Sequence, residues 1–169
     1  MNPALKDMID EIDQKFECLQ IDFEDASWRS SIPSEAGWYL IKTETPIDVL
    51  KSIEAPQHKA HINIPETINT TLTLRKLGIA ISPSAKEDYV VYNGEADNLK
   101  GRAREHERGH AKTYCLGLSD YEKLKKYKWT FCYVPVSKCK VSLEIDKLLR
   151  LAVEQGWRAK NGWPILCRK

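Results

Sequence analysis

The chain has 169 residues, of which 42% are hydrophobic and 30% are charged. This length and balance are typical of one folded domain with a real core and exclude a disordered chain. No apolar run approaches the ~18 residues that span a bilayer, so we expect no membrane partner. The net charge of +2 is divided unevenly, since residues 1–95 hold 9 Lys and Arg against 16 Asp and Glu, whereas residues 96–169 hold 17 against 8. This asymmetry predicts a basic face that meets a polyanion, although a solvated charged surface has the same composition.

The five cysteines are scattered along the chain: Cys18, Cys115, Cys132, Cys139 and Cys167. No CxxC pair is present, which argues against a zinc ribbon and against the disulfide framework of a secreted protein. Residues 1–15 are acidic and helical in pattern, unlike a signal peptide. We therefore expect a reducing, cytoplasmic setting.

The first predicted element is an amphipathic helix. Apolar residues recur at steps of three and four, which is the spacing of one helix face: Leu5, Met8, Ile9, Ile12, Phe16 and Leu19. We expect residues 1–31 to form a helical extension before the first strand.

Three strands are predicted where aromatic and branched residues adjoin turn residues. They cover residues 37–43 (GWYLIKT), 89–93 (YVVYN) and 129–136 (WTFCYVPV). Gly94 is expected to end the second strand, and Pro135 places the end of the third at an edge or exit of the sheet.

Residues 44–88 separate the first two strands and are too long for a hairpin loop. They contain a threonine-rich, weakly alternating run over residues 67–81. We expect this insertion to add strands and to carry substrate recognition, so that its deletion changes substrate choice and leaves the fold. His58 and His61 are metal-ligand types, but a surface position is the favoured interpretation.

The second strand is followed by a predicted helix over residues 98–107. Asp97 is placed to cap its N-terminus, and Gly109 to end it. Arg102 precedes His106 by four residues, so both side chains lie on one face. A guanidinium can hold phosphate oxygens, and an imidazole can transfer protons near neutral pH. Such a pair is also common on exposed helix faces.

Two further helices are predicted towards the C-terminus. Residues 119–126 have the pattern of a short helix. Residues 142–155 have that of a longer helix, which Ser142 caps and Gly156 closes.

Two tripeptides and a helix follow one another in a distinctive order. The tripeptides lie on the first and second predicted strands: Gly37-Trp38-Tyr39 and Tyr92-Asn93-Gly94. The helix residues then follow without a gap: Ala96, Asn98, Leu99, Arg102 and His106. Together these pieces resemble the catalytic layout of the GIY-YIG nuclease family.

The resemblance extends to the last predicted helix. Glu154 lies at the place of the family's metal-binding glutamate. Cys167 stands where the family has a late asparagine, so that supporting role differs here. Glu144 and Asp146, near the start of the same helix, are interpreted as charges that complement its dipole.

The resemblance implies an α/β (α+β) fold in one domain, with a small, mostly antiparallel three-stranded sheet flanked by helices. It also implies a metal-dependent endonuclease that cleaves DNA, with RNA left open, and that uses Mg²⁺ or Mn²⁺. Tyr39 would take a proton from water, as phenolate or through His106. Tyr92 would shape the same pocket, Arg102 would stabilise charge on the phosphate, and Glu154 would bind the metal.

Basic residues accompany the predicted site on and after its helix: Lys100, Arg104, Arg108 and Lys112. We expect them to contact phosphates with a salt-dependent affinity. A second group interleaves lysines with tyrosines that could stack on unpaired bases: Tyr121, Lys123, Lys125, Lys126, Tyr127 and Lys128. A solvated surface is the favoured interpretation of this second group.

Two alternative functions remain. Residues 106–110 spell HExxH, in which two histidines would bind zinc beside a general-base glutamate. Against a zinc peptidase, Arg108 places a cation among the ligands and Gly109 weakens the helix. The other alternative is a module of the same fold that binds nucleic acid without cutting it.

Overall fold

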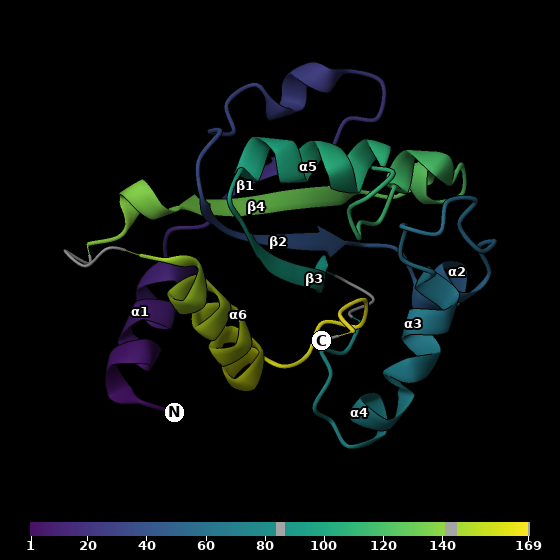
Figure 1. Cartoon of the computed structure of the whole chain (residues 1–169). Helices are drawn as coiled ribbons and strands as arrows, with labels where there is room; N and C mark the ends of the chain where they lie inside the picture. The colour runs from purple at the N-terminus through teal and green to yellow at the C-terminus, as the bar shows by residue number, and fades with distance from the viewer. Residues whose placement is uncertain (84–86, 141–144, 169) are drawn as a thin grey trace.

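The computed structural model describes residues 1–83, 87–140 and 145–168 and has a mixed α+β fold (Figure 1). Its described residues form a four-stranded antiparallel sheet with the strands β1 (Glu17–Gln20), β2 (Gly37–Thr43), β3 (Tyr89–Ala96) and β4 (Trp129–Pro135). The α-helices of this part of the chain are α1 (Pro3–Asp13), α2 (Ile47–Lys51), α3 (Ile64–Thr70), α4 (Leu72–Lys76), α5 (Leu99–Arg108) and α6 (Lys147–Asn161). None of these helices has the length and apolar character needed to cross a membrane.

The strand order is β1-β4-β2-β3, and every neighbouring pair is antiparallel. Strand β1 is a fourth strand that the sequence does not predict, because residues 17–20 continue the apolar spacing of the preceding helix. That helix instead ends at Asp13. Strand β3 passes through Gly94, which we expected to end it, and continues to Ala96.

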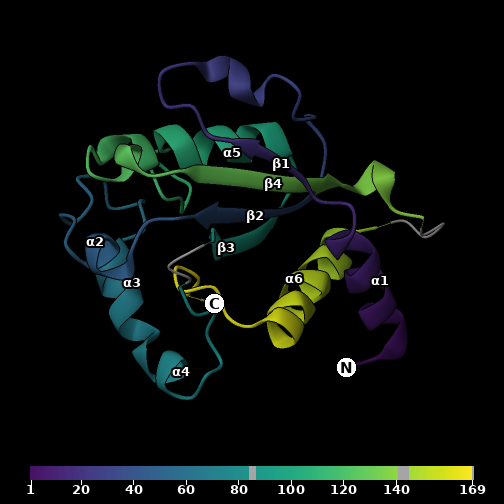
Figure 2. The same cartoon turned by 180° about the vertical axis from the view of Figure 1, so that it is seen from behind.

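Helices cover both faces of the sheet (Figures 1 and 2). Helix α5 lies on one face, and α1 and α6 lie together on the other. Because successive side chains of a strand point to opposite faces, β2 contributes Tyr39 and Ile41 to the α5 side and Trp38 and Leu40 to the α1/α6 side. Because both faces of β2 are buried, its apolar residues follow one another without alternating polar residues.

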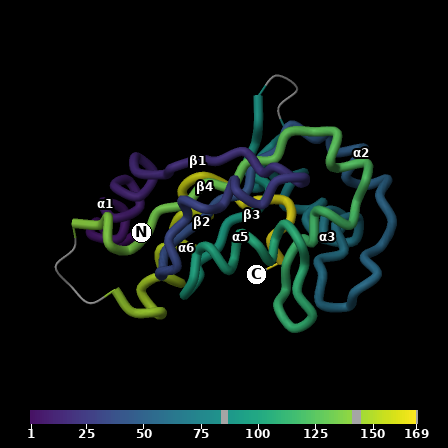
Figure 3. Tube along the Cα trace, turned by 90° about the horizontal axis from the view of Figure 1, so that it is seen from above, coloured from purple at the N-terminus to yellow at the C-terminus, as the bar shows by residue number. Residues whose placement is uncertain are grey.

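In its described residues, 44–83 and 87–88, the insertion forms helices α2, α3 and α4 and not the strands that we expected. It lies at the end of the sheet remote from α1 (Figure 3). Its Leu50, Ile62, Ile64 and Ile68 are fully buried in the core on the α5 side. The insertion is thus part of the core, which argues against the expectation that its deletion leaves the fold.

The C-terminal segment runs along the outer edge of β3. Leu166 donates its backbone N–H to the carbonyl of Val91 over 2.9 Å. The insertion holds this segment, since Trp163 and Ala80 form a parallel bridge and Thr71 Oγ1 donates to the carbonyl of Ile165 over 3.3 Å. The C-terminal segment therefore covers part of the outer edge of β3, at Val91.

Helix α5 ends at Arg108, and Gly109 follows as its C-cap with φ of 80°, as predicted. Its N-cap, however, is Asn98, whose side chain accepts a hydrogen bond of 2.8 Å from the N–H of Gly101. Asp97 does not cap the helix but pairs with Arg150 of α6. In place of the predicted helix at 119–126, the chain makes two short 3₁₀ turns, Leu118–Asp120 and Leu124–Lys126.

Helix α6 begins after Asp146, whose carboxylate accepts from the N–H of Leu149 over 2.8 Å. Ser142, the predicted cap, and Glu144 lie outside the described residues. Gly156 does not close the helix but lies within it. A Cβ at this position would come within 2.7 Å of Ile9 Cδ1 of α1. The glycine thus permits the close approach of α1 and α6.

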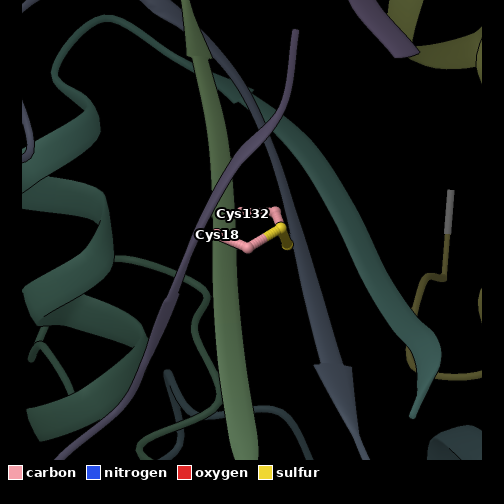
Figure 4. The surroundings of a disulfide bond; sticks show 2 residues. All are labelled: Cys18 and Cys132. Atoms are coloured by element: carbon pink, nitrogen blue, oxygen red, sulfur yellow. A yellow bond between two sulfur atoms is a disulfide. The ribbon is translucent and has the colours of Figure 1, made fainter. Parts of the chain in front are cut away.

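A disulfide joins Cys18 of β1 to Cys132 of β4 (Figure 4). The two residues are direct partners in the antiparallel register of these strands. The scattered cysteines give no sequence signal for this bond, because it depends on a pairing between residues 114 positions apart.

Candidate active site

The candidate site begins with a cluster between β2 and α5. The phenol oxygen of Tyr39 is the centre: Arg102 Nε donates to it over 2.9 Å, and His106 Nε2 lies 3.1 Å from it. The predicted i,i+4 face of α5 therefore points at the sheet and not at solvent. Tyr39 and His106 are fully buried.

Two glycines make this arrangement possible. Tyr39 and Gly94 face each other in the β2–β3 register, and a Cβ on Gly94 would lie 2.4 Å from the Tyr39 oxygen. A Cβ on Gly37 would lie 2.3 Å from the carbonyl oxygen of Val134 on β4. Each of the two tripeptides therefore needs its glycine for a steric reason. The Val134 carbonyl lies close to Gly37, and the Tyr39 ring occupies the space above Gly94.

The protonation of His106 follows from its surroundings. Its Nδ1 accepts a hydrogen bond of 3.3 Å from the backbone N–H of Leu116. In a neutral imidazole the proton is then on Nε2, which donates to Tyr39. Burial, reinforced by the neighbouring Arg102 cation, lowers the pKa of His106 well below its ordinary value, so the ring is neutral.

Two effects act in opposite directions on the pKa of the Tyr39 phenol. Burial raises its pKa well above the ordinary value, and the Arg102 cation opposes that rise. Its oxygen accepts from Arg102 Nε and, in the tautomer inferred above, from His106 Nε2–H, and both bonds favour the phenolate form relative to an equally buried phenol without donors. In the free protein the direction is set by burial, so the phenol keeps its proton.

Arg102 is held by three groups. Besides Tyr39, its Nη1 donates to Glu105 Oε2 over 2.8 Å and its Nη2 donates to the carbonyl of Tyr114 over 2.7 Å. A guanidinium has five N–H donors. The described partners engage three of them, so a phosphate oxygen could accept from the second donor of each terminal nitrogen.

Tyr92 of β3 completes the aromatic part of the site. Its ring centroid lies 6.1 Å from that of Tyr39 in a stacked arrangement and 4.9 Å from that of His106. Burial raises the pKa of Tyr92 to about 12. The structure therefore brings Tyr39, Tyr92, Arg102 and His106 together, as predicted.

Glu154 reaches the same region from α6, on the other side of β3. Its Oε2 accepts from the backbone N–H of Glu95 at the free edge of β3 over 3.1 Å, and its Oε1 accepts from Arg158 Nη2. Burial raises the pKa of the Glu154 carboxyl, and the Arg158 cation opposes that rise. Glu154 and Tyr92 line one pocket.

Asn93 and Cys167 support this side of the site. Asn93 Oδ1 accepts from Arg158 Nε over 2.7 Å, and its Nδ2 donates to the carbonyl of Glu154 over 3.3 Å. Cys167 Sγ accepts from the N–H of Asn93 over 3.4 Å. Burial raises the pKa of the Cys167 thiol to about 11, so it is neutral. Asn93 thus positions both Glu154 and Arg158.

Two pockets adjoin these groups. One of about 410 Å³ is lined by Tyr92, Tyr114, Glu154, Arg158, Cys167 and Arg168. Another of about 400 Å³ is lined by Glu95, Ala96, Asp97, Asn98, Gly101, Arg102, Glu105 and Thr113. The candidate site therefore lies around the end of β3, with Arg102 in one pocket and Glu154 in the other.

Sequence reasoning missed Arg158, Arg168 and Tyr114. Arg158 has a visible signal, because it follows Glu154 by one helical turn and can pair with it. Arg168 and Tyr114 have none, since they reach the pocket from the C-terminal segment and from the loop after α5.

The predicted basic group does not surround these pockets. At 100° per residue, Lys100, Arg104 and Arg108 lie on the face of α5 opposite Arg102 and His106. Lys100 Nζ donates to the carbonyl of Ser30 over 3.1 Å. Arg104 is exposed, and Lys112 is exposed in the loop beyond α5.

The second lysine-rich group also differs from the expectation. Tyr121 is 7% exposed and packs in the core, so its ring is not available for stacking on bases. Tyr127 is half-buried. Lys123 Nζ donates to the carbonyl of Ser52 of the insertion over 3.3 Å.

The HExxH residues do not converge. Helix α5 ends at Arg108, so His110 lies outside it, where its Nδ1 is 2.7 Å from Thr113 Oγ1. His106 points at Tyr39, and the fully buried Glu107 accepts hydrogen bonds from Arg29, Trp28 and Arg108. These residues fix the loop before β2 to α5 and do not form a zinc site.

His61 is buried, which corrects the expected surface position, whereas His58 is exposed. His61 Nε2 accepts from the N–H of His110 over 3.2 Å, and a Cβ on Gly109 or Gly117 would come within 3 Å of the ring. His61 therefore joins the insertion to the loop after α5 as a packed core residue.

The donor set fits one kind of metal. The described residues contain no group of three or more His, Cys, Asp or Glu side chains that could hold an ion. Zinc and calcium sites need several protein ligands, whereas Mg²⁺ keeps most of its waters and is held by one or two carboxylates together with substrate phosphates. Glu154, which lines a pocket, is compatible with Mg²⁺ or Mn²⁺ in that manner.

Comparisons of the chain with protein-family models, with curated proteins and with solved structures find no match.

Proposed function

We propose that this chain is a metal-dependent endonuclease that hydrolyses phosphodiester bonds in DNA. The observation that supports it most is the pair of hydrogen bonds to the Tyr39 oxygen, 2.9 Å from Arg102 Nε and 3.1 Å from His106 Nε2. Phosphodiester hydrolysis needs a base for water, a cation for the developing charge and a metal ion. The resemblance to GIY-YIG nucleases assigns these tasks to residues that lie around one end of β3.

In this proposal Tyr39 acts as the base in its phenolate form. The phenol first releases its own proton to solvent, and the two donors on its oxygen stabilise the phenolate against the burial that raises its pKa. The phenolate then takes the proton from the attacking water and becomes a phenol again. His106 orients the phenol through its Nε2–H and is not itself the base, since its Nδ1 accepts the Leu116 N–H. This refines the expectation that the proton passes either to Tyr39 or through His106.

Arg102 and Glu154 serve to stabilise the negative charge of the phosphate, one directly and the other through a metal ion. The two remaining terminal donors of Arg102 bind the phosphate oxygens. Glu154 holds the divalent ion, which when bound neutralises the scissile phosphate and its leaving oxygen. Arg158 keeps the Glu154 carboxylate in position through Nη2.

One observation favours a second candidate, a module that binds nucleic acid without cutting it. Both oxygens of Glu154 already accept hydrogen bonds, from Arg158 and from the N–H of Glu95. A metal ion has to share these oxygens with both donors. If a metal ion cannot bind there, the pockets bind nucleic acid but the phosphodiester bond is not cleaved.

Incubation of supercoiled plasmid with Mg²⁺ or Mn²⁺ separates the two candidates. We expect nicking by the native chain, and its loss in Arg102→Ala and in Glu154→Ala. Arg75→Ala and Glu122→Ala, which change the same residue types away from both pockets, serve as matched controls and should cut normally. Plasmid binding without cleavage in either metal would favour the binding module.

A further inference from the structure

The pocket beside the free edge of β3 has the size and the walls of a site for one nucleotide. Its volume of about 410 Å³ lies in the range of roughly 300–1,000 Å³ that is usual for small ligands. Its walls carry two phenol rings, two guanidinium groups, a carboxylate and a thiol. A double helix cannot enter such a space, whereas a single base can.

Tyr114 and Arg168 stack on each other at this pocket, and each leaves its other face for a base. Tyr114 is 39% exposed, and the Arg168 guanidinium carbon lies 5.7 Å from the centroid of its ring. Helix α3 fixes Arg168, since Thr67 Oγ1 accepts from its Nε over 3.2 Å and Glu66 Oε1 lies 3.2 Å from its Nη2. Unpaired bases stack on both aromatic rings and guanidinium planes.

The candidate catalytic residues hold Tyr114 in place. Arg102 Nη2 donates to the Tyr114 carbonyl over 2.7 Å, and two residues later the Leu116 N–H donates to His106 over 3.3 Å. The stacking surface is therefore fixed relative to Tyr39. A base against Tyr114 would therefore share its pocket with Glu154.

We propose that this pocket holds the base of one unpaired nucleotide beside the bond that is cut. The inference depends on the proposed nuclease function, and it names the preferred substrate class: DNA with an unpaired or extruded nucleotide, which should bind more tightly than a fully paired duplex. A base within a stacked duplex reaches such a pocket only by leaving the stack, which costs unstacking energy. An unpaired nucleotide avoids that cost.

Binding of two short duplexes in EDTA, where no cleavage occurs, tests this inference. One duplex carries a single unpaired 2-aminopurine, and the other carries the same base in a pair. We expect the native chain to bind the first more tightly and to change its fluorescence through stacking. Tyr114→Ala should weaken that binding by roughly 5- to 100-fold. Tyr127→Ala, which removes a half-buried tyrosine that lines neither pocket of the site, should match the native chain.

Thermal unfolding of each variant confirms that it is folded. Equal affinity for the two duplexes, no effect of Tyr114→Ala, or no binding of either probe would overturn the inference, even if the native chain cleaves plasmid. Selective binding of the unpaired probe by a chain that cuts nothing in Mg²⁺ or Mn²⁺ would instead keep the pocket assignment and reject the nuclease.

Discussion

The Tyr39 phenol is enclosed by residues that each have one defined task. Arg102 and His106 donate to its oxygen, and Gly94 leaves room for its ring. The Leu116 N–H sets the tautomer of His106. At the scale of single residues, the geometry of the site depends on a glycine and a backbone amide as much as on the charged side chains.

Gly94→Ala should damage the site through Tyr39. The added Cβ would lie 2.4 Å from the phenol oxygen and 2.6 Å from Cζ, so the ring has to move. Overpacking of this kind costs about 1–3 kcal/mol. We expect urea unfolding to show that loss, and a smaller loss when Gly94→Ala is made in a Tyr39→Phe background, where the nearest clashing atom is absent. Additive effects in this double-mutant cycle would contradict the steric argument.

The lowered pKa of His106 should make the stability of the protein depend on pH. Its pKa is well below the ordinary value in the folded state, and close to about 6.5 in the unfolded chain. Below that pH only the unfolded chain takes up the proton, so the free energy of unfolding falls as pH decreases from 7 to 5, by at most about 1.4 kcal/mol per pH unit. Above pH 7 this contribution is complete and constant.

Urea unfolding at pH 7.5 and 5.5 measures this effect. The native chain should lose more stability on acidification than His106→Gln, because the variant has no imidazole to protonate. His58→Gln, a change at an exposed histidine, should behave like the native chain. An identical pH dependence in His106→Gln would show that the imidazole is not held neutral.

At the scale of elements, the insertion is the part of the chain with the most consequence for the site. It contributes Leu50, Ile62, Ile64 and Ile68, all fully buried, to the core and holds the segment that carries Cys167 and Arg168. The pocket wall next to Glu154 thus depends on helices that lie at one end of the sheet (Figure 3).

Replacement of residues 44–88 by an Asn-Gly turn should abolish cooperative folding. Thr43 and Tyr89 are partners in the β2–β3 register, so a short hairpin can join them. Each of the four lost aliphatic side chains contributes about 1.5–3 kcal/mol, and their sum is comparable with a total stability of about 5–15 kcal/mol.

Circular dichroism and thermal unfolding give the measurement. Leu77→Ser, at a residue of the insertion that is 67% exposed, is the control and should unfold at the native temperature. A shortened chain with a sharp transition near the native one would show that the insertion is a separate accessory.

The sequence predicts the elements whose signals are local. Strand β2, the end of α5 at Gly109 and the Arg102–His106 face follow from composition and spacing, and all are present. The end of β3, the α6 boundaries and β1 were predicted wrongly, because tertiary contacts decide them. Glycine is a common turn residue, which led to the prediction that Gly94 and Gly156 end their elements. In the fold Gly94 instead makes room for Tyr39, and Gly156 makes room for Ile9.

The site is predictable to a similar degree. Four predicted side chains gather at the Tyr39 oxygen or beside it, since their spacing on strands and a helix fixes their direction. The placement of Lys100, Arg104 and Arg108 could have been judged from helix periodicity alone. Tyr114 and Arg168 could not, because no sequence pattern brings a loop and a C-terminal segment to one pocket.

At the scale of the whole molecule, segments far apart in the sequence meet at one end of β3. Strand β2 brings Tyr39, helix α5 brings Arg102 and His106, and α6 brings Glu154 from the opposite face of the sheet (Figures 1 and 2). Elsewhere the Cys18–Cys132 disulfide joins β1 to the middle of the sheet. We propose that this meeting point is a catalytic site centred on Tyr39.

The rate of plasmid cleavage by Tyr39→Phe, compared with Tyr133→Phe, tests that claim most directly. The two tyrosines are partners in the β2–β4 register, both are buried, and the Tyr133 hydroxyl lies 3.0 Å from Glu17 and away from the site. We predict that Tyr39→Phe lowers the single-turnover rate by roughly 10²–10⁴-fold, the contribution of a general base, while Tyr133→Phe cuts at the native rate. Cleavage by Tyr39→Phe at the native rate, with the fold intact, would contradict the account.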